Sequence, residues 1–149
     1  MNNKLYLSAQ AELLYNHLKQ YQMYKKSLEY WERKLKENNE KIKDLESVGA
    51  IRYDKQPSDN HVEQSTILNN LISEEMNILS HINDFKKELL DREKLCDRTQ
   101  SQTQSYIRYI LFDSHSWWEC ENEFYMSQTA IRYHIMKDLT EIVRADMES

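Results

Sequence analysis

Residues that interrupt helices are nearly absent from this chain: its 149 residues include one glycine and one proline. A sheet needs many tight turns, and tight turns draw heavily on these two residues. Long hydrophobic runs are missing as well, since no stretch approaches the roughly 20 apolar residues that span a bilayer. The composition therefore excludes a turn-rich β fold, and we expect an all-α protein without a membrane span.

Cysteine is scarce too, with only Cys96 and Cys120. They form no CxxC pair and indicate no disulfide framework, which favours a reducing, cytoplasmic location. The opening residues carry one lysine and no unbroken apolar run, unlike a secretory signal. The cysteines and histidines lack metal-ligand spacing, and neither a Ser/His/Asp arrangement nor a glycine-rich phosphate loop stands out. We therefore expect no metal site, no cofactor and no enzymatic activity.

Charge is distributed unevenly within a formal net charge of -5. Residues 1–56 carry 11 Lys/Arg against 8 Asp/Glu, a balance of +3. Residues 57–100 carry 5 against 9, and residues 101–149 carry 4 against 8, so each of these two segments has a balance of -4. A protein that binds duplex DNA normally presents a basic surface, and the C-terminal third of this chain is acidic.

The first long stretch shows a strict seven-residue repeat of apolar side chains. This repeat predicts a helix over about 4–47 with coiled-coil packing, either within one chain or between subunits. In the second case the same stripe is the seam of a homodimer. The residues of the repeat are Leu7, Leu14, Tyr21, Leu28, Leu35 and Ile42.

A second helix is predicted over 60–97, after a linker at 48–59 that holds Gly49 and Pro57. A chain reversal in this linker gives a long antiparallel hairpin, so residues 1–97 form a helical stalk. The apolar surface of the second helix is broad for one partner helix, which favours a third helix or a second subunit. Its predicted seam consists of Leu68, Ile72, Leu79, Ile82, Leu89 and Cys96.

A polar hinge is expected at 98–105, followed by a three-helix head at 106–149. Residues 106–112 are almost entirely apolar, which predicts a short buried helix. Ser116 with Glu119 forms a capping box, and Ser127 begins a last helix with apolar residues at helical spacing. A short helix, a three-residue turn and a longer helix form a helix-turn-helix, whose second helix can enter the DNA major groove.

Hydrogen-bonding side chains occupy the start of this last helix. We expect Ser127, Gln128 and Thr129 at its N-terminus, where backbone N–H groups and the helix dipole favour a phosphate. Arg132 is the candidate for guanine, since its fork reaches O6 and N7 together. Tyr133 and Lys137 are candidates for backbone contacts. Within the motif, Glu121 stands where a small residue is usual and Tyr125 where the turn usually has glycine or asparagine.

The C-terminal segment resembles the RinA/ArpU-type phage transcriptional regulators. The resemblance rests on YIRYI at 106–110, on Ser116-Trp117 with Glu119, and on Ser127 opening a helix that reaches Leu139. The layout of a long first helix, a linker with Gln56-Pro57-Ser58 and a second long helix is also similar. The resemblance implies a phage-encoded protein with a helix-turn-helix like region four of sigma factors, which binds double-stranded DNA and activates transcription with host RNA polymerase.

Two other classes of function are compatible with the residues. An acidic, aromatic-rich helical protein can bind a host polymerase, nuclease or other protein without reading DNA. A coiled-coil assembly factor is the third alternative. DNA binding that weakens with salt separates the DNA-binding regulator from these two alternatives.

Overall fold

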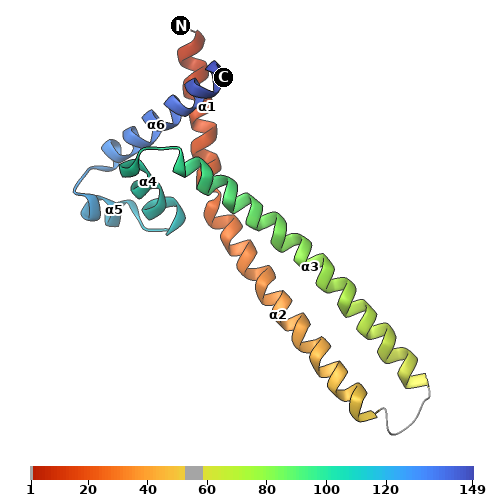
Figure 1. Cartoon of the computed structure of the whole chain (residues 1–149). Helices are drawn as coiled ribbons and strands as arrows, with labels where there is room; N and C mark the ends of the chain where they lie inside the picture. Colours follow the sequence, from red (N-terminus) through yellow and green to blue (C-terminus); the bar gives the residue numbers. More distant parts are fainter. Residues whose placement is uncertain (1, 53–58) are drawn as a thin grey trace. The chain divides into compact units, whose positions relative to one another are not determined.

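The structure, a computed structural model, describes residues 2–52 and 59–149 (Figure 1). Every regular element in these ranges is helical, which confirms the predicted all-α class. The helices are α1 (Asn2–Lys19), α2 (Tyr21–Arg52), α3 (Asp59–Asp97), α4 (Ser101–Ile107), the π-helical turn η1 (Arg108–Phe112), α5 (Trp117–Phe124) and α6 (Gln128–Glu148).

The chain divides into two compact units. The head unit comprises Met1–Lys25 and Lys87–Ser149, and the hairpin unit comprises Lys26–Lys86. This division differs from the predicted stalk of 1–97 and head of 106–149. The physical reason is that Ala11, Tyr15 and Leu18 of α1 are buried in the same hydrophobic core as α4, α5 and α6. The N-terminal helix thus belongs to the head.

The helix predicted over 4–47 is interrupted at Gln20. α1 ends at Lys19 and α2 begins at Tyr21. The carbonyl of His17 accepts two hydrogen bonds at this break, from Gln20 N at 3.2 Å and from Arg92 Nε at 2.8 Å. The Arg92 side chain is buried, stands over the Tyr24 ring, and also donates to Gln20 and Glu88. Arg92 therefore satisfies the backbone group that the interruption exposes.

The core of the head unit lies between α1, the C-terminal end of α3, α4, η1, α5 and α6. Buried isoleucines and leucine line one face of α6, as the sequence predicts, and α1 packs against the same helix. Residues 106–112 are largely buried, as expected, although they continue α4 through a π-helical turn in which Asp113 N donates to Arg108 O. The buried α6 residues are Ile131, Ile135, Asp138, Leu139, Ile142 and Val143.

The segment predicted as a polar hinge, 98–105, is a folded turn and the start of α4. Thr99 and Thr103 are buried, and Thr99 Oγ1 donates to the Cys96 carbonyl at 2.6 Å. The backbone N–H of Gln100 donates to the buried carboxylate of Asp138 on α6 at 3.0 Å. Polar residues here make specific hydrogen bonds within the head, so their polarity does not indicate a hinge.

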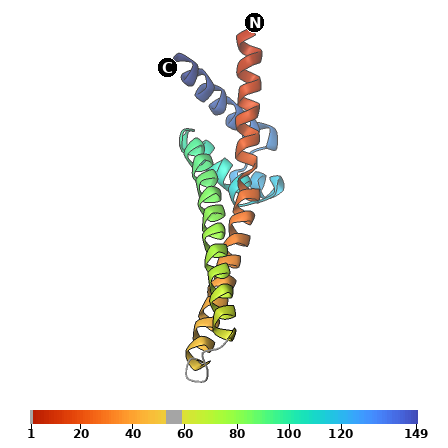
Figure 2. The same cartoon turned by 90° about the vertical axis from the view of Figure 1, so that its right-hand side faces the viewer.

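In the hairpin unit, α2 and α3 run side by side in opposite directions (Figures 1 and 2). The Trp31 ring stacks on His81, with centroids 4.1 Å apart. Asn38 is buried on the α2 side and donates to the Leu71 carbonyl at 2.9 Å. A single buried asparagine in such a seam favours one register over its alternatives.

The predicted α3 seam is only partly correct. Ile82 and Leu89 are buried, whereas Ile72 and Leu79 are exposed. The residues of α3 within the hairpin unit that are buried or half-buried follow alternating spacings of four and three, with one addition, His81, which stacks on Trp31. These alternating positions are Gln64, Leu68, Leu71, Glu75, Ile78, Ile82 and Phe85.

The predicted linker at 48–59 is shorter in the structure at both ends. α2 continues past Gly49 to Arg52, and α3 begins at Asp59. An isolated glycine lowers helix stability by about 1 kcal/mol relative to alanine without ending the helix. The rest of the linker, including Pro57, lies outside the described residues.

Candidate nucleic-acid interface

α5, a three-residue turn and α6 follow one another as the sequence predicts. The Ser116 hydroxyl caps α5 by accepting from Glu119 N at 3.1 Å. The Ser127 hydroxyl caps α6 by accepting from Ala130 N at 3.2 Å. These short side chains satisfy backbone donors that the first helical turn leaves free, so both helices begin at defined residues.

The turn between the helices contains one left-handed residue, Tyr125, with φ 54° and ψ 40°. This conformation costs a residue with a bulky side chain of order 1 kcal/mol. The next residue, Met126, packs against the core, and the Tyr106 hydroxyl lies 3.0 Å from its sulfur. Packing of Met126 therefore holds the turn in place while the Tyr125 ring points into solvent.

The outward face of α6 carries three of the predicted site residues. Thr129, Tyr133 and Lys137 are all exposed, and their four-residue spacing places them on successive turns of one helix face. A threonine, a tyrosine and a lysine offer hydrogen bonds to base edges or phosphates. This face of α6 thus presents three hydrogen-bonding side chains to solvent.

Arg132 lies at the flank of this face, next to α1. Its guanidinium is 3.9 Å from the Glu12 carboxylate and 5.3 Å from the centroid of the Tyr15 ring. Both charged side chains are half-exposed, and an exposed ion pair of this length contributes little, about 0–1 kcal/mol. Arg132 is therefore held loosely toward α1 rather than along the Thr129–Tyr133–Lys137 face.

The N-terminus of α6 is already occupied by a carboxylate. Glu121 of α5 accepts from the backbone N–H of Gln128 at 2.8 Å, while Ser127 takes the N–H of Ala130. Glu121 thus supplies negative charge at the helix end where the sequence predicts a phosphate bound by Ser127, Gln128 and Thr129, and that phosphate site stays a prediction. Glu121 therefore acts as a second cap at the N-terminus of α6.

Two large aromatic side chains on the motif were missed by reasoning from the sequence. Trp118 is 73% exposed and Tyr125 is 92% exposed. Trp117 and Cys120 pack toward the head core, so Trp118, between them in the chain, points outward on the same helix. Tryptophan and tyrosine are enriched at protein interfaces, because each combines a large apolar ring with a hydrogen-bonding group.

Acidic groups accompany these rings. Glu119 and Glu123 are exposed on α5, and the Glu119 carboxylate is 2.7 Å from Nδ1 of His115. This hydrogen bond to His115 lowers the pKa of Glu119, with a smaller contribution from Ser116. The side of the motif formed by α5 therefore carries negative charge at neutral pH, in contrast to the outward face of α6.

The predicted heptad seam is divided between the two units. Leu14 and Tyr21 pack against the head core, and Tyr21 stacks on Phe112 with centroids 3.9 Å apart. The Tyr21 hydroxyl donates to Glu93 at 2.8 Å; burial, and then this hydrogen bond, raise the pKa of Tyr21 to about 12. Leu7 is half-buried on α1, and the three remaining positions, Leu28, Leu35 and Ile42, are half-buried on α2.

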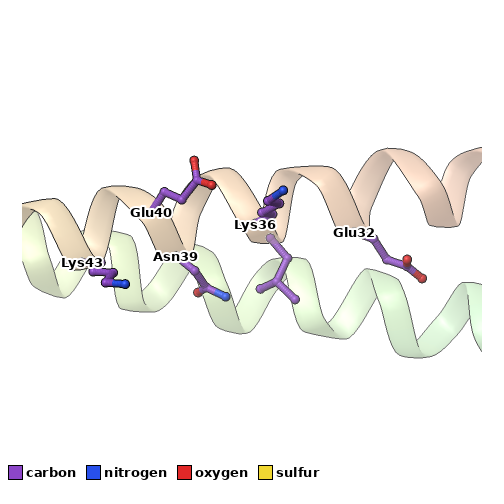
Figure 3. A pocket seen from close by; sticks show the side chains of 6 residues that line it. Glu32, Lys36, Asn39, Glu40 and Lys43 are labelled. Carbon is purple, nitrogen blue, oxygen red and sulfur yellow. The ribbon is translucent and has the colours of Figure 1, made fainter.

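A depression on α2 offers no chemistry of its own (Figure 3). Its lining residues all come from successive turns of that one helix: Glu32, Leu35, Lys36, Asn39, Glu40 and Lys43. Within residues 2–52 and 59–149, no cluster of three or more histidine, cysteine, aspartate or glutamate residues is suited to a metal ion. None of the helices in those ranges combines the length and the apolar character that a membrane crossing requires.

Comparison with known proteins gives no relative: no family model, no curated protein and no solved structure matches this chain. The geometry of α5 and α6 is therefore the basis for inferring function.

Proposed function

We propose that the protein is a DNA-binding transcriptional regulator, encoded by a phage and acting with host RNA polymerase, that reads DNA through the outward face of α6. One observation carries the proposal. A capped short helix and a capped longer helix are joined by a three-residue turn, and Thr129, Tyr133 and Lys137 stand exposed on the second helix. The role is one of binding rather than catalysis.

The contacts follow from the position of each side chain. Lys137 binds a backbone phosphate as a point charge, and Tyr133 donates its hydroxyl to a phosphate or a base edge. Thr129 and Gln128 reach base edges from the first turn of the helix. Arg132 leaves its long, exposed pair with Glu12 to bind guanine, because that pair is weak.

The negative charge of Glu121 disfavours DNA binding at the N-terminus of α6. Its carboxylate at the start of α6 occupies the N–H of Gln128 and repels a phosphate approaching the same helix end. Contacts to DNA therefore depend on side chains farther along α6. Replacing Glu121 by glutamine removes the charge and keeps a side chain that can accept the same hydrogen bond.

The experiment measures binding to the phage's own upstream DNA across a salt series. Wild type is expected to bind with an affinity that falls steeply with salt, and Lys137→Ala is expected to reduce the slope by about one unit. Arg132→Ala should weaken binding by about 1–3 kcal/mol and reduce discrimination between sequences. Glu121→Gln should bind more tightly than wild type.

Arg144→Ala is the matched control, because Arg144 is an exposed arginine of α6 near its C-terminal end, paired with Glu141 at 2.8 Å. It should leave the affinity and the sequence preference unchanged. No binding by wild type at low salt, or an equal loss in the Arg132 and Arg144 variants, contradicts the proposal.

A specific observation favours a second candidate function, a protein-binding module. Trp118 on α5 and Tyr125 in the turn after it are exposed, and α5 also carries exposed Glu119 and Glu123. Aromatic rings within a charged rim are typical of the central residues of protein interfaces. If Trp118→Ala abolishes binding to purified host RNA polymerase while DNA binding is absent throughout, this candidate replaces the first.

A further inference from the structure

α3 carries a second stripe of apolar side chains, beside the one that faces α2. Ile72 is 43% exposed, Met76 is 69% exposed and Leu79 is 39% exposed. Each of the three follows directly after a position of the inner seam. One residue corresponds to a rotation of about 100° around a helix, so the two stripes lie on adjacent sides of α3.

Two apolar stripes at about 100° indicate a helix that packs against two neighbours. A helix that packs against one neighbour needs a single stripe, whereas a helix in a four-helix bundle contacts two neighbours in directions roughly at right angles. α2 occupies the inner stripe of α3 within the hairpin unit, as the bonds from Asn38 to Leu71 and from Trp31 to His81 show. The second stripe is the one that a further helix would cover.

The residue types of the second stripe are nearly symmetric about Met76 along the helix. Met76 is its centre, with Ile72 four residues before it and Leu79 three residues after it. Exposed asparagines, Asn69 and Asn83, lie seven residues on either side of Met76. In a two-fold interface the residue that contacts a given position must itself be contacted by that position, so a self-complementary stripe fits a second copy of itself.

We propose that two copies of this chain associate through this second stripe, with their α3 helices antiparallel and Met76 on the two-fold axis. Asn69 of one copy then opposes Asn83 of the other, and Ile72 lies next to Leu79, offset by one residue from direct opposition. The result is a four-helix bundle made from two hairpins. This surface differs from the heptad at Leu7 to Ile42, whose side chains are half-buried within the chain.

The charges support a second copy as the occupant. Between positions 69 and 83 the only charged residues are Glu74 and Glu75. Glu75 is half-buried at an inner-seam position, and Glu74 lies two residues from Met76, on the far side of the helix. The stripe itself is uncharged, so two identical stripes meet without repulsion, whereas a strongly charged partner would find nothing to pair with.

The interface is small, with three apolar side chains from each copy. Interfaces at the low end of the size range belong to reversible complexes, so we expect a dimer that dissociates in the micromolar range. The inference concerns the hairpin unit alone and does not depend on whether α6 binds DNA. The two proposals can therefore fail separately.

Cross-linking of the full chain tests the two-fold axis directly. Met76→Cys places one thiol from each copy on the axis, so mild oxidation should yield a covalent dimer. Ile67→Cys is the matched control, because Ile67 is 44% exposed on a different side of the same helix. The native Cys96 and Cys120 are both 0% exposed and do not compete. Equal cross-linking in the two variants, or none in Met76→Cys, overturns the proposal.

Sedimentation across the micromolar range tests the energetics. Wild type should change from monomer to dimer, Ile72→Lys should weaken the dimer by about tenfold or more, and Ile67→Lys should leave it unchanged. Circular dichroism should show the same helix content in all three proteins, because both isoleucines are exposed. A wild type that stays monomeric throughout, or equal losses in the two variants, overturns the proposal as well.

Discussion

The head unit and the hairpin unit are both helical but bury their side chains to different extents. In the head, α1, the end of α3, α4, η1, α5 and α6 surround one core, and residues such as Ile107, Ile131 and Leu139 are completely buried. In the hairpin, most seam residues of α2 and α3, including Leu35 and Ile42, are half-buried. A pair of helices encloses a few central seam residues, such as Ile78 and Ile82, and leaves the apolar side chains beside the seam uncovered.

The difference has a consequence for specificity. The head is defined by many unlike contacts: two serine caps, a left-handed tyrosine, a π-helical turn and the buried Arg92. The hairpin repeats one kind of contact along its length, and a repeat of seven residues permits shifted alignments. Asn38, with its hydrogen bond to the Leu71 carbonyl, is the feature that distinguishes one alignment from the others.

The same substitution in the two units should have unequal effects. Leu139→Ala in the head removes a completely buried side chain and should lower the free energy of unfolding by about 4 kcal/mol. Leu35→Ala in the hairpin removes a half-buried one and should cost about 1–2 kcal/mol. Urea unfolding followed by circular dichroism measures both. Equal costs would mean that the two units do not differ in burial as described.

The head contains a buried arginine, Arg92, and an exposed one, Arg98, whose contributions to stability should differ. Arg92→Met leaves the His17 carbonyl without its side-chain donor and removes the bonds to Gln20 and Glu88, so we expect a loss of about 2–3 kcal/mol. Arg98→Met breaks an exposed pair with Asp146 and should cost at most about 1 kcal/mol. Thermal unfolding of both variants tests the difference.

If Arg92→Met were as stable as Arg98→Met, the interruption at Gln20 would not need its buried cation. A continuous helix from α1 into α2 would then be the simplest explanation.

Alkaline pH should weaken the head through groups that burial keeps neutral. Burial raises the pKa of Cys96 and of Cys120 from 9.0 to about 11, and the acidic neighbours Glu121 and Glu123 add to the effect at Cys120. Because the folded-state pKa lies above the unfolded one, this stabilisation is complete below pH 9 and is lost as the pH rises through 11. Tyr21, with its pKa raised to about 12, extends the loss beyond that range.

Thermal unfolding between pH 9 and pH 11 measures this loss. The variant with both cysteines replaced by alanine should lose less stability over the same interval than wild type. Residues 26–86 contain no cysteine, so the thiol contribution belongs to the head. An identical pH dependence in the two proteins would show that the thiols do not contribute.

Hydrophobic periodicity and capping residues were sufficient to predict the fold class and the start of α5 and α6. The scarcity of glycine and proline predicted the all-α class, which is confirmed. Ser116 and Ser127 begin α5 and α6 where expected, and the buried face of α6 is the predicted one. These features depend on neighbours within one or two turns of helix, so the chain's own sequence contains all the information they need.

Tertiary contacts decided where the first helix is interrupted and which apolar faces are covered. The heptad from Leu7 to Ile42 predicts one straight helix, yet Arg92, distant in sequence, stabilises a break at Gln20 and α1 joins the head core. Ile72 and Leu79 fit a seam as well as their neighbours do, and only the position of α2 shows that they are exposed. Likewise Glu121 occupies the end of α6 from another helix. A periodic pattern identifies an apolar face, while the choice of the partner that covers it belongs to the folded chain.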